Sequence, residues 1–280
     1  MFDTHCHLNF SRFKKRVDEV IQNAIASGVD HFIVPGTDIE SSKKAVEIAN
    51  KHENIYAAVG IHPHNVFELT QMNSSRKILA LEQLLQNKKV VAVGEVGMDR
   101  HIYEKTKYEV YQVDEKFMEM QKELLELQIQ LAIKHNKSII FHNRKTKKEI
   151  MEVIKKNWDK KLEGRAVFHC CEPDDVGTSR DLSLLEFAKE HKMFIGVDGD
   201  VTYWKEKQEF IKKAPLKMLI LETDSPFLLP EPLRSQKLYP NEPKNIKVIA
   251  EFIAKIRGDS INQLIKSTTV NARKLFQLPE

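Results

Sequence analysis

Short apolar runs recur along the chain and alternate with longer segments that have the periodicity of amphipathic helices. Eight runs have the length of a strand: MFDTHCHL, DHFIVPG, IYAAVGIHP, VVAVGEVGMD, SIIFHNR, RAVFHCC, MFIGVDG and KMLILETDSP. The clearest helical segment lies between the fourth and fifth runs, with apolar residues spaced 3, 4, 3 and 4 apart at Phe117, Met120, Leu124, Leu127 and Leu131. The pattern therefore predicts alternating strands and helices.

Strands that are apolar along most of their length, separated by helices, are typical of a parallel sheet covered on its outer face. Eight such units in 280 residues fit a closed (β/α)₈ TIM barrel better than an open doubly wound sheet, and no GxGxxG or P-loop motif favours the open sheet. No change in composition marks a boundary, so we expect one domain over residues 1–280. The charged stretch DRHIYEKTKYEVYQVD is predicted to be an insertion after the fourth strand.

Composition narrows the class of protein. With 41% apolar and 30% charged residues the chain reads as globular, and a net charge of +4 is too small to indicate nucleic-acid binding by itself. No run approaches the roughly 18 apolar residues of a membrane span, and DTHCH occupies the place of a signal peptide. Three cysteines are too few for a disulfide framework. We therefore expect a cytoplasmic protein that does not act at a membrane.

Polar residues gather at the C-terminal ends of the predicted strands. They are His5, His7, His62, His64, Glu95, His142, His169 and Asp224. In a parallel barrel these ends converge on one face, where barrel enzymes build their active sites. A lone histidine is more often a core or rim residue, but so many on one face, together with two acids, indicate a shared site.

The residue types favour divalent metal ions. Four imidazoles and two carboxylates exceed what one tetrahedral zinc requires, whereas two ions bridged by a carboxylate would use them all. Such a pair contacts both the attacking and the leaving oxygen of a phosphate ester and activates a water, so no nucleophilic Ser or Cys is needed. Mg²⁺, Mn²⁺ and Zn²⁺ all remain open as the physiological ion.

The ordered motifs DTHCH, GIHPH, VGEVGMD, FHNR, FHCC and LETDSPFLLP, followed by NEP, resemble the TatD family of metal-dependent deoxyribonucleases in the amidohydrolase superfamily. By that resemblance the metal ligands are His5, His7, Glu95, His142, His169 and Asp224. It further implies that Glu95 bridges the ions and that Asp224 accepts a proton, which makes these two the catalytic carboxylates. The resemblance also places His62, His64 and Arg144 near the substrate phosphate.

The function implied is hydrolysis of DNA phosphodiester bonds with a metal-activated water, by an exonuclease that acts on free or single-stranded ends. Two alternatives use the same residues. One is an amidohydrolase or an ester hydrolase, for example on aminoacyl-tRNA, since one fold hosts many chemistries. The other is a TatD-like subunit of a larger DNA-processing or defence assembly.

Several features near the expected substrate mouth bear on specificity. The chain has Cys170, Cys171 and Glu172 where the family usually continues HCF with a small residue and glycine, and Pro240 where a basic residue usually precedes NEP. The basic run at residues 144–148 either attracts phosphate or forms a solvated first helical turn. The aromatic residues Tyr203, Trp204 and Phe227 either stack on an unpaired base or pack beneath the rim.

Overall fold

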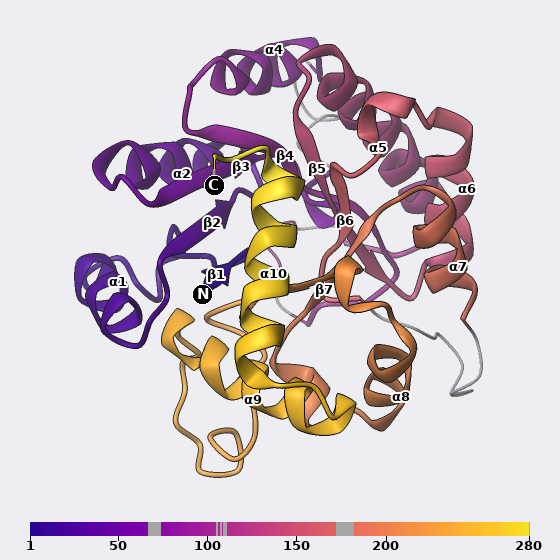
Figure 1. Cartoon of the computed structure of the whole chain (residues 1–280). Coiled ribbons are helices and arrows are strands. Elements are labelled where there is room, and N and C mark those ends of the chain that lie inside the picture. Colours follow the sequence, from indigo (N-terminus) through magenta and orange to yellow (C-terminus); the bar gives the residue numbers. More distant parts are fainter. Residues whose placement is uncertain (67–73, 105, 107, 109–110, 172–181, 280) are drawn as a thin grey trace.

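Eight parallel strands form a barrel in which each strand pairs with the next one along the chain (Figure 1). The computed structural model describes residues 1–66, 74–104, 106, 108, 111–171 and 182–279. The strands are β1 Phe2–Asp3, β2 His31–Pro35, β3 Ile55–Val59, β4 Val90–Asp99, β5 Ser138–Arg144, β6 Ala166–Phe168, β7 Phe194–Val197 and β8 Leu219–Leu221. The predicted (β/α)₈ barrel is thus confirmed.

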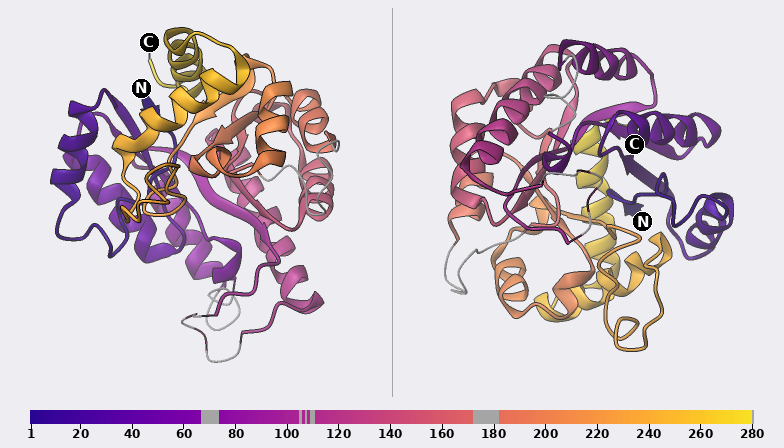
Figure 2. Two further views of the ribbon diagram at one scale, coloured as in Figure 1. Left: turned by 90° about the horizontal axis from the view of Figure 1, so that it is seen from below. Right: turned by 180° about the vertical axis from the view of Figure 1, so that it is seen from behind.

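Helices surround the strands on the outside of the barrel, as two further views show (Figure 2). They are α1 Val17–Ala26, α2 Ile39–Lys51, α4 Ser74–Leu85, α5 Glu115–Lys134, α6 Lys147–Asn157, α7 Ser183–Glu190, α8 Lys205–Lys213, α9 Ile246–Arg257 and α10 Ile261–Phe276. In the described part of the chain no helix is both long and apolar enough to cross a membrane.

Hydrogen bonds between β1 and β8 complete the barrel. The Thr4 amide donates to the Leu221 carbonyl over 3.1 Å. The buried carboxylate of Asp3 accepts from both the amide and the hydroxyl of Thr223, at 3.0 and 2.6 Å. These bonds hold the segment that carries His5 against the segment that carries Asp224.

One end of the barrel is filled by apolar side chains, one from each strand: Phe2, Ile33, Ala58, Ala92, Ile140, Val167, Phe194 and Ile220. Leu275 and Phe276 at the end of α10 pack against this layer, and Figure 1 shows α10 crossing the barrel there. Because side chains alternate along a strand, the residues two positions later point to the same face. From Ile140 and Val167 that step reaches His142 and His169, so the apolar layer gives way to polar residues towards the other end.

Helix α5 lies where the periodicity predicted a helix, but its buried face differs from the predicted stripe. Leu127 is 46% exposed and Met120 only half-buried, whereas Gln121 and Gln128 are fully buried. Apolar periodicity could not indicate this, because both glutamines are buried through hydrogen bonds to the backbone of neighbouring segments. Gln128 accepts from the Ile61 amide at 2.7 Å and donates to the Ile61 carbonyl at 3.0 Å.

Candidate metal centre

A cavity of about 480 Å³ opens at the C-terminal ends of the strands. Most residues that the sequence singled out lie on its wall: His7, His62, His64, Glu95, His142, Arg144, His169 and Asp224. His5 is fully buried and directly contacts His7 and Glu95. The structure therefore brings all nine candidate residues to one place, although they come from six separate segments of the chain.

His5, His7 and Asp224 direct one ligand atom each towards a common point, and Glu95 faces the same two histidines. The Nε2 atoms of His5 and His7 lie 3.2 Å apart. Glu95 Oε2 is 3.6 and 3.7 Å from these two nitrogens, and Asp224 Oδ1 is 3.8 and 3.4 Å from them. Two ligands of one tetrahedral ion with bonds of about 2.0 Å lie about 3.3 Å apart, so this spacing fits a shared divalent cation.

The second oxygen of Glu95 faces a different set of histidines. Glu95 Oε1 lies 2.7 Å from His142 Nδ1, 3.6 Å from His169 Nε2 and 3.9 Å from His62 Nε2. One carboxylate therefore divides its two oxygens between two groups of nitrogen ligands. This is the arrangement required of a residue that bridges two metal ions.

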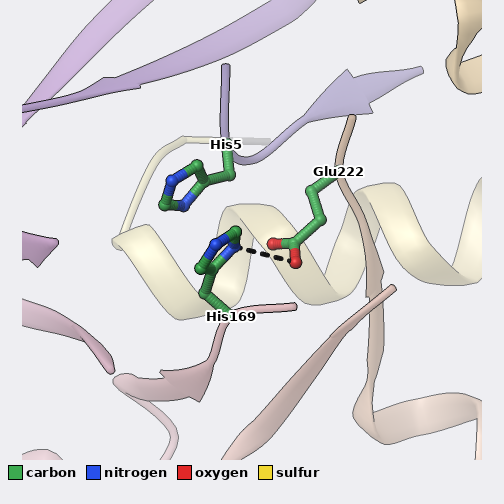
Figure 3. A group of neighbouring side chains, drawn as sticks. All are labelled: His5, His169 and Glu222. Carbon is green, nitrogen blue, oxygen red and sulfur yellow. Dashed lines mark hydrogen bonds and ion pairs between the residues drawn. The ribbon is translucent and has the colours of Figure 1, made fainter. Parts of the chain in front are cut away.

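His169 is oriented by a carboxylate that the sequence analysis did not assign. Its Nδ1 lies 3.0 Å from Oε1 of the buried Glu222, and its ring stacks on that of His5 with centroids 3.5 Å apart (Figure 3). Burial alone would lower the pKa of His169, but Glu222, together with Glu95 and Asp224, raises that pKa to about 9. Gly196 on β7 makes room for Glu222, because a Cβ there would lie 2.4 Å from Glu222 Oε2.

His142 lies between two carboxylates. Its Nδ1 faces Glu95, and its Nε2 is 3.0 Å from Oδ2 of Asp99, which is fully buried at the end of β4. Burial alone would lower the pKa of His142, but Glu95 and Asp99 together raise that pKa to about 10. A carboxylate on the far side of a ligating imidazole fixes its orientation and increases its basicity.

His62 presents a hydrogen-bond donor to the cavity. Its Nδ1 accepts from the His64 amide at 3.2 Å. Burial, reinforced by the nearby His142, lowers the pKa of His62 to about 3, so the ring is neutral. A neutral imidazole that accepts at Nδ1 carries its proton on Nε2. His62 can therefore donate from Nε2 to Glu95 or to a bound anion.

His64 connects the site to the charged insertion. Its Nε2 lies 3.2 Å from Asp99 Oδ2, and its Nδ1 is hydrogen-bonded to the hydroxyl of Tyr111. Tyr103, also in the insertion, donates to Asp99 Oδ2 at 3.2 Å and accepts from Arg144 Nη1 at 3.2 Å. The described part of the insertion thus contributes to the cavity wall and contacts two of the three expected phosphate-binding residues.

Asp99 and Glu222 are functional residues that sequence reasoning missed. Both stand in quoted motifs, VGEVGMD and LETDSP, but only their positions relative to His142 and His169 show what they do. A third missed group is Lys207, which is fully buried on α8 and lies 3.3 Å from Asp198. Its ammonium also reaches Asp200 and Cys170 on the cavity wall, so a buried polar cluster supports the site from that side.

The departures from the family pattern lie close to this centre. Cys170 lines the cavity, and its amide donates to Glu222 Oε1 at 2.5 Å. Cys171 is buried, while Glu172 lies outside the described residues. Pro240 precedes Asn241, whose side-chain Nδ2 donates to the Thr223 carbonyl at 2.9 Å.

Some residues of the basic run, and some of the aromatic residues that could stack on a base, line the cavity, whereas others lie away from it. Arg144 lines the cavity, whereas Lys147 is buried in the first turn of α6. Tyr203 lies under the guanidinium of Arg234 at 4.2 Å and is not part of the cavity wall. Phe227 does line the cavity.

Comparisons with known proteins agree with this site. A family model described as TatD related DNase matches residues 2–277. The chain is 31% identical to the uncharacterized metal-dependent hydrolase YabD of Bacillus subtilis, over 99% of each chain. It is 30% identical to the 3′-5′ ssDNA/RNA exonuclease TatD of Erwinia tasmaniensis, over 99% of this chain and 100% of that one.

Among solved structures, the TatD homologue YjjV of Escherichia coli superposes with a TM-score of 0.82 at 28% identity, over 100% of this chain and 98% of that one. The resemblance seen in the motifs is therefore confirmed along nearly the whole length of the sequence. The chain belongs to the TatD family of metal-dependent hydrolases.

Proposed function

We propose that this protein is an exonuclease that hydrolyses phosphodiester bonds at a free, single-stranded end of DNA. The observation that carries the proposal is the position of Glu95, whose Oε2 faces His5 and His7 while its Oε1 faces His142 and His169. Two divalent ions side by side can contact both the attacking and the leaving oxygen of a phosphate ester, which suits hydrolysis of a phosphodiester bond.

The residues fit two ions of the class Mg²⁺, Mn²⁺ or Zn²⁺. His5, His7, Glu95 and Asp224 would hold one of them. Glu95, His142 and His169 would hold the other. When bound, such ions supply Lewis-acid stabilisation of the phosphate and a water of lowered pKa.

The chain's own groups complete the reaction. Asp224 presents Oδ1 to the centre and is a carboxylate able to accept a proton from the attacking water. Arg144 supplies a guanidinium, which matches the geometry of phosphate oxygens. The Nε2–H of His62 adds a neutral donor on the same side of the cavity. These groups bind and orient the phosphate beside Glu95 and Asp224.

The names of the relatives favour a single-stranded end and a 3′ to 5′ direction. The Erwinia tasmaniensis relative carries both properties in its name. The cavity is a hollow at the end of the barrel, and its wall includes part of the charged insertion. A hollow of this kind accepts a chain end more readily than the middle of a duplex, which supports exonuclease action.

The test compares substrates on one preparation of purified protein. Oligonucleotides labelled at either end, in single-stranded DNA, duplex DNA and single-stranded RNA, would be incubated with and without added Mg²⁺, Mn²⁺ or Zn²⁺. Stepwise shortening of single-stranded DNA from its 3′ end, only with metal present, is the expected result. Hydrolysis of an aminoacyl ester or a cyclic amide with no cleavage of DNA would favour the other hydrolase classes.

Metal content requires a separate measurement. Elemental analysis after reconstitution should give up to two equivalents per chain, and anomalous scattering should place the ions beside Glu95. Absence of metal at His5, His7, His142 and His169, even at millimolar concentration, would contradict the proposal whatever substrate is used.

A further inference from the structure

Phe227 is a half-exposed aromatic side chain on the wall of the cavity. It is 49% exposed, more than any other phenylalanine among the described residues. Leaving a ring of this size in water forgoes much of the stabilisation that its burial would give. An exposed aromatic ring on the wall of a site that binds phosphate is a surface on which an unpaired base can stack.

The backbone and two neighbouring rings hold Phe227 in place. Its amide donates to the Asp224 carbonyl at 2.8 Å, and the Asp224 amide in turn donates to the His5 carbonyl at 2.9 Å. Its ring makes edge-to-face contacts with His7 and Phe10, with centroids 6.1 and 6.0 Å away. The exposed ring is therefore fixed on the same turn as the metal ligand Asp224.

Two tyrosines on the cavity wall, Tyr103 and Tyr111, are already engaged in hydrogen bonds. Tyr103 is hydrogen-bonded to both Asp99 and Arg144, and Tyr111 is hydrogen-bonded to His64. Through these contacts the two tyrosines form part of the phosphate-binding side of the cavity. Phe227 stands on the side of His7, where its ring combines large exposed area with a fixed position.

We propose that Phe227, with Phe10 beside it, is the platform on which the terminal nucleobase of a single-stranded substrate stacks. The inference rests on the proposed exonuclease function and names the subsite that would hold the terminal nucleotide. His7, a ligand of the centre where the phosphate reacts, contacts Phe227, so a base attached to the reacting nucleotide lies within reach of the ring. Every base has an aromatic face, and the subsite therefore selects for the presence of a base rather than for its identity.

The experiment uses two single-stranded oligonucleotides that differ only in the terminal nucleotide, which carries a base in one and is abasic in the other. The metal-loaded parent, Phe227→Leu and Phe227→Trp are compared by kcat/KM on both. Tyr239→Leu is the matched control, because Tyr239 is also exposed, at 56%, but is not part of the cavity wall. A second readout is the quenching of 2-aminopurine at the terminus by metal-depleted protein, which does not require cleavage.

The parent and Phe227→Trp should prefer the end that carries a base by about tenfold, the size of one base–aromatic stacking interaction. Phe227→Leu should cleave both ends equally, bind metal as the parent does and lose the quenching, while Tyr239→Leu should match the parent. Equal cleavage of both ends by the parent, or a preference retained in Phe227→Leu, would overturn the inference and leave the exonuclease function intact.

Other outcomes also decide. If Phe227→Leu loses metal, the test uses only the parent and Phe227→Trp. A preference of both for the end that carries a base supports the inference, and equal cleavage of both ends overturns it. Failure of the parent to cleave either oligonucleotide would contradict the proposed function, and the quenching measurement would then report on the subsite alone.

Discussion

Gln121 forms a two-point hydrogen bond with the backbone of Asp99. Its Oε1 accepts from the Asp99 amide at 2.8 Å, and its Nε2 donates to the Asp99 carbonyl at 3.0 Å. The Asp99 side chain meanwhile holds His142 and His64. A glutamine on the inner face of α5 thus fixes the carboxylate that orients one of the expected metal ligands.

Replacing this glutamine by leucine should separate the role of the hydrogen bonds from that of packing. Gln121→Leu keeps a similar volume but leaves the buried amide and carbonyl of Asp99 without partners, which costs about 2 kcal/mol of unfolding free energy. Urea denaturation would measure the loss, and metal titration should show weaker binding. Gln130→Leu is the matched control, because Gln130 lies on the exposed face of the same helix. Equal stability of the two variants would refute this role.

The sequence predicted the barrel and the residues around its site because both depend on simple regularities. Apolar runs indicate parallel strands, and the C-terminal ends of the strands of a parallel barrel converge on one face. The sequence therefore predicted that His5, His142 and Asp224 lie close together. It could not assign Glu222 or Asp99, since acids that orient histidines follow no spacing rule. Buried Gln121 and Gln128 were missed for a related reason: their partners are backbone groups far away in the sequence, and periodicity treats them as exposed.

Tyr103 should act on substrate binding through Arg144. Its hydroxyl accepts from Arg144 Nη1 and donates to Asp99. Tyr103→Phe removes both bonds, and one hydrogen bond to a charged group contributes about 1.5 kcal/mol. We expect KM for single-stranded DNA to rise about tenfold, with metal content unchanged. Arg144→Ala should weaken substrate binding at least as much.

A double-mutant cycle on these two residues checks the connection. If Tyr103 acts by positioning Arg144, then Tyr103→Phe should have little further effect on KM in the Arg144→Ala background. Tyr239→Phe, at an exposed position outside the cavity, serves as control. Additive effects of the two substitutions would show that Tyr103 contacts the substrate independently.

When metal is absent, protons occupy histidines of the site, and the pH dependence of metal affinity should reveal these protons. Nearby carboxylates raise the pKa of His142 to about 10 and that of His169 to about 9, from 6.5, against the opposing effect of burial. Metal must displace these protons. We expect metal affinity to rise with pH up to about 10, and calorimetry in buffers of different ionisation enthalpy to detect proton release on binding. Affinity independent of pH would contradict this.

The same shifts predict how the stability of the metal-free protein changes with pH. A histidine whose pKa is higher in the folded than in the unfolded protein stabilises the fold fully below the unfolded value, and that contribution is lost as the pH rises through the folded value. For His142, the pH range over which this stabilisation is lost runs from 6.5 to about 10. The melting temperature of chelator-treated protein should therefore fall across it, and reconstituted protein should show a smaller decrease. His142→Gln should reduce the slope for the metal-free form.

Asp224→Asn should separate the chemistry from the fold. As a carboxylate, Asp224 can hold an ion together with His5 and His7 and accept a proton from the attacking water, and an amide does neither well. We expect turnover to fall by at least about 10², the low end for loss of a positioned proton acceptor. Without metal, Asp224 and Glu95 place two carboxylates in one partly buried site, and the amide relieves their repulsion. The metal-free variant should consequently melt no lower than the metal-free parent.

Asp18→Asn, at an exposed position on α1, is the control for the substitution itself. Turnover near that of the parent would remove Asp224 from the reaction, and a metal-free variant that fails to fold would make it a structural residue.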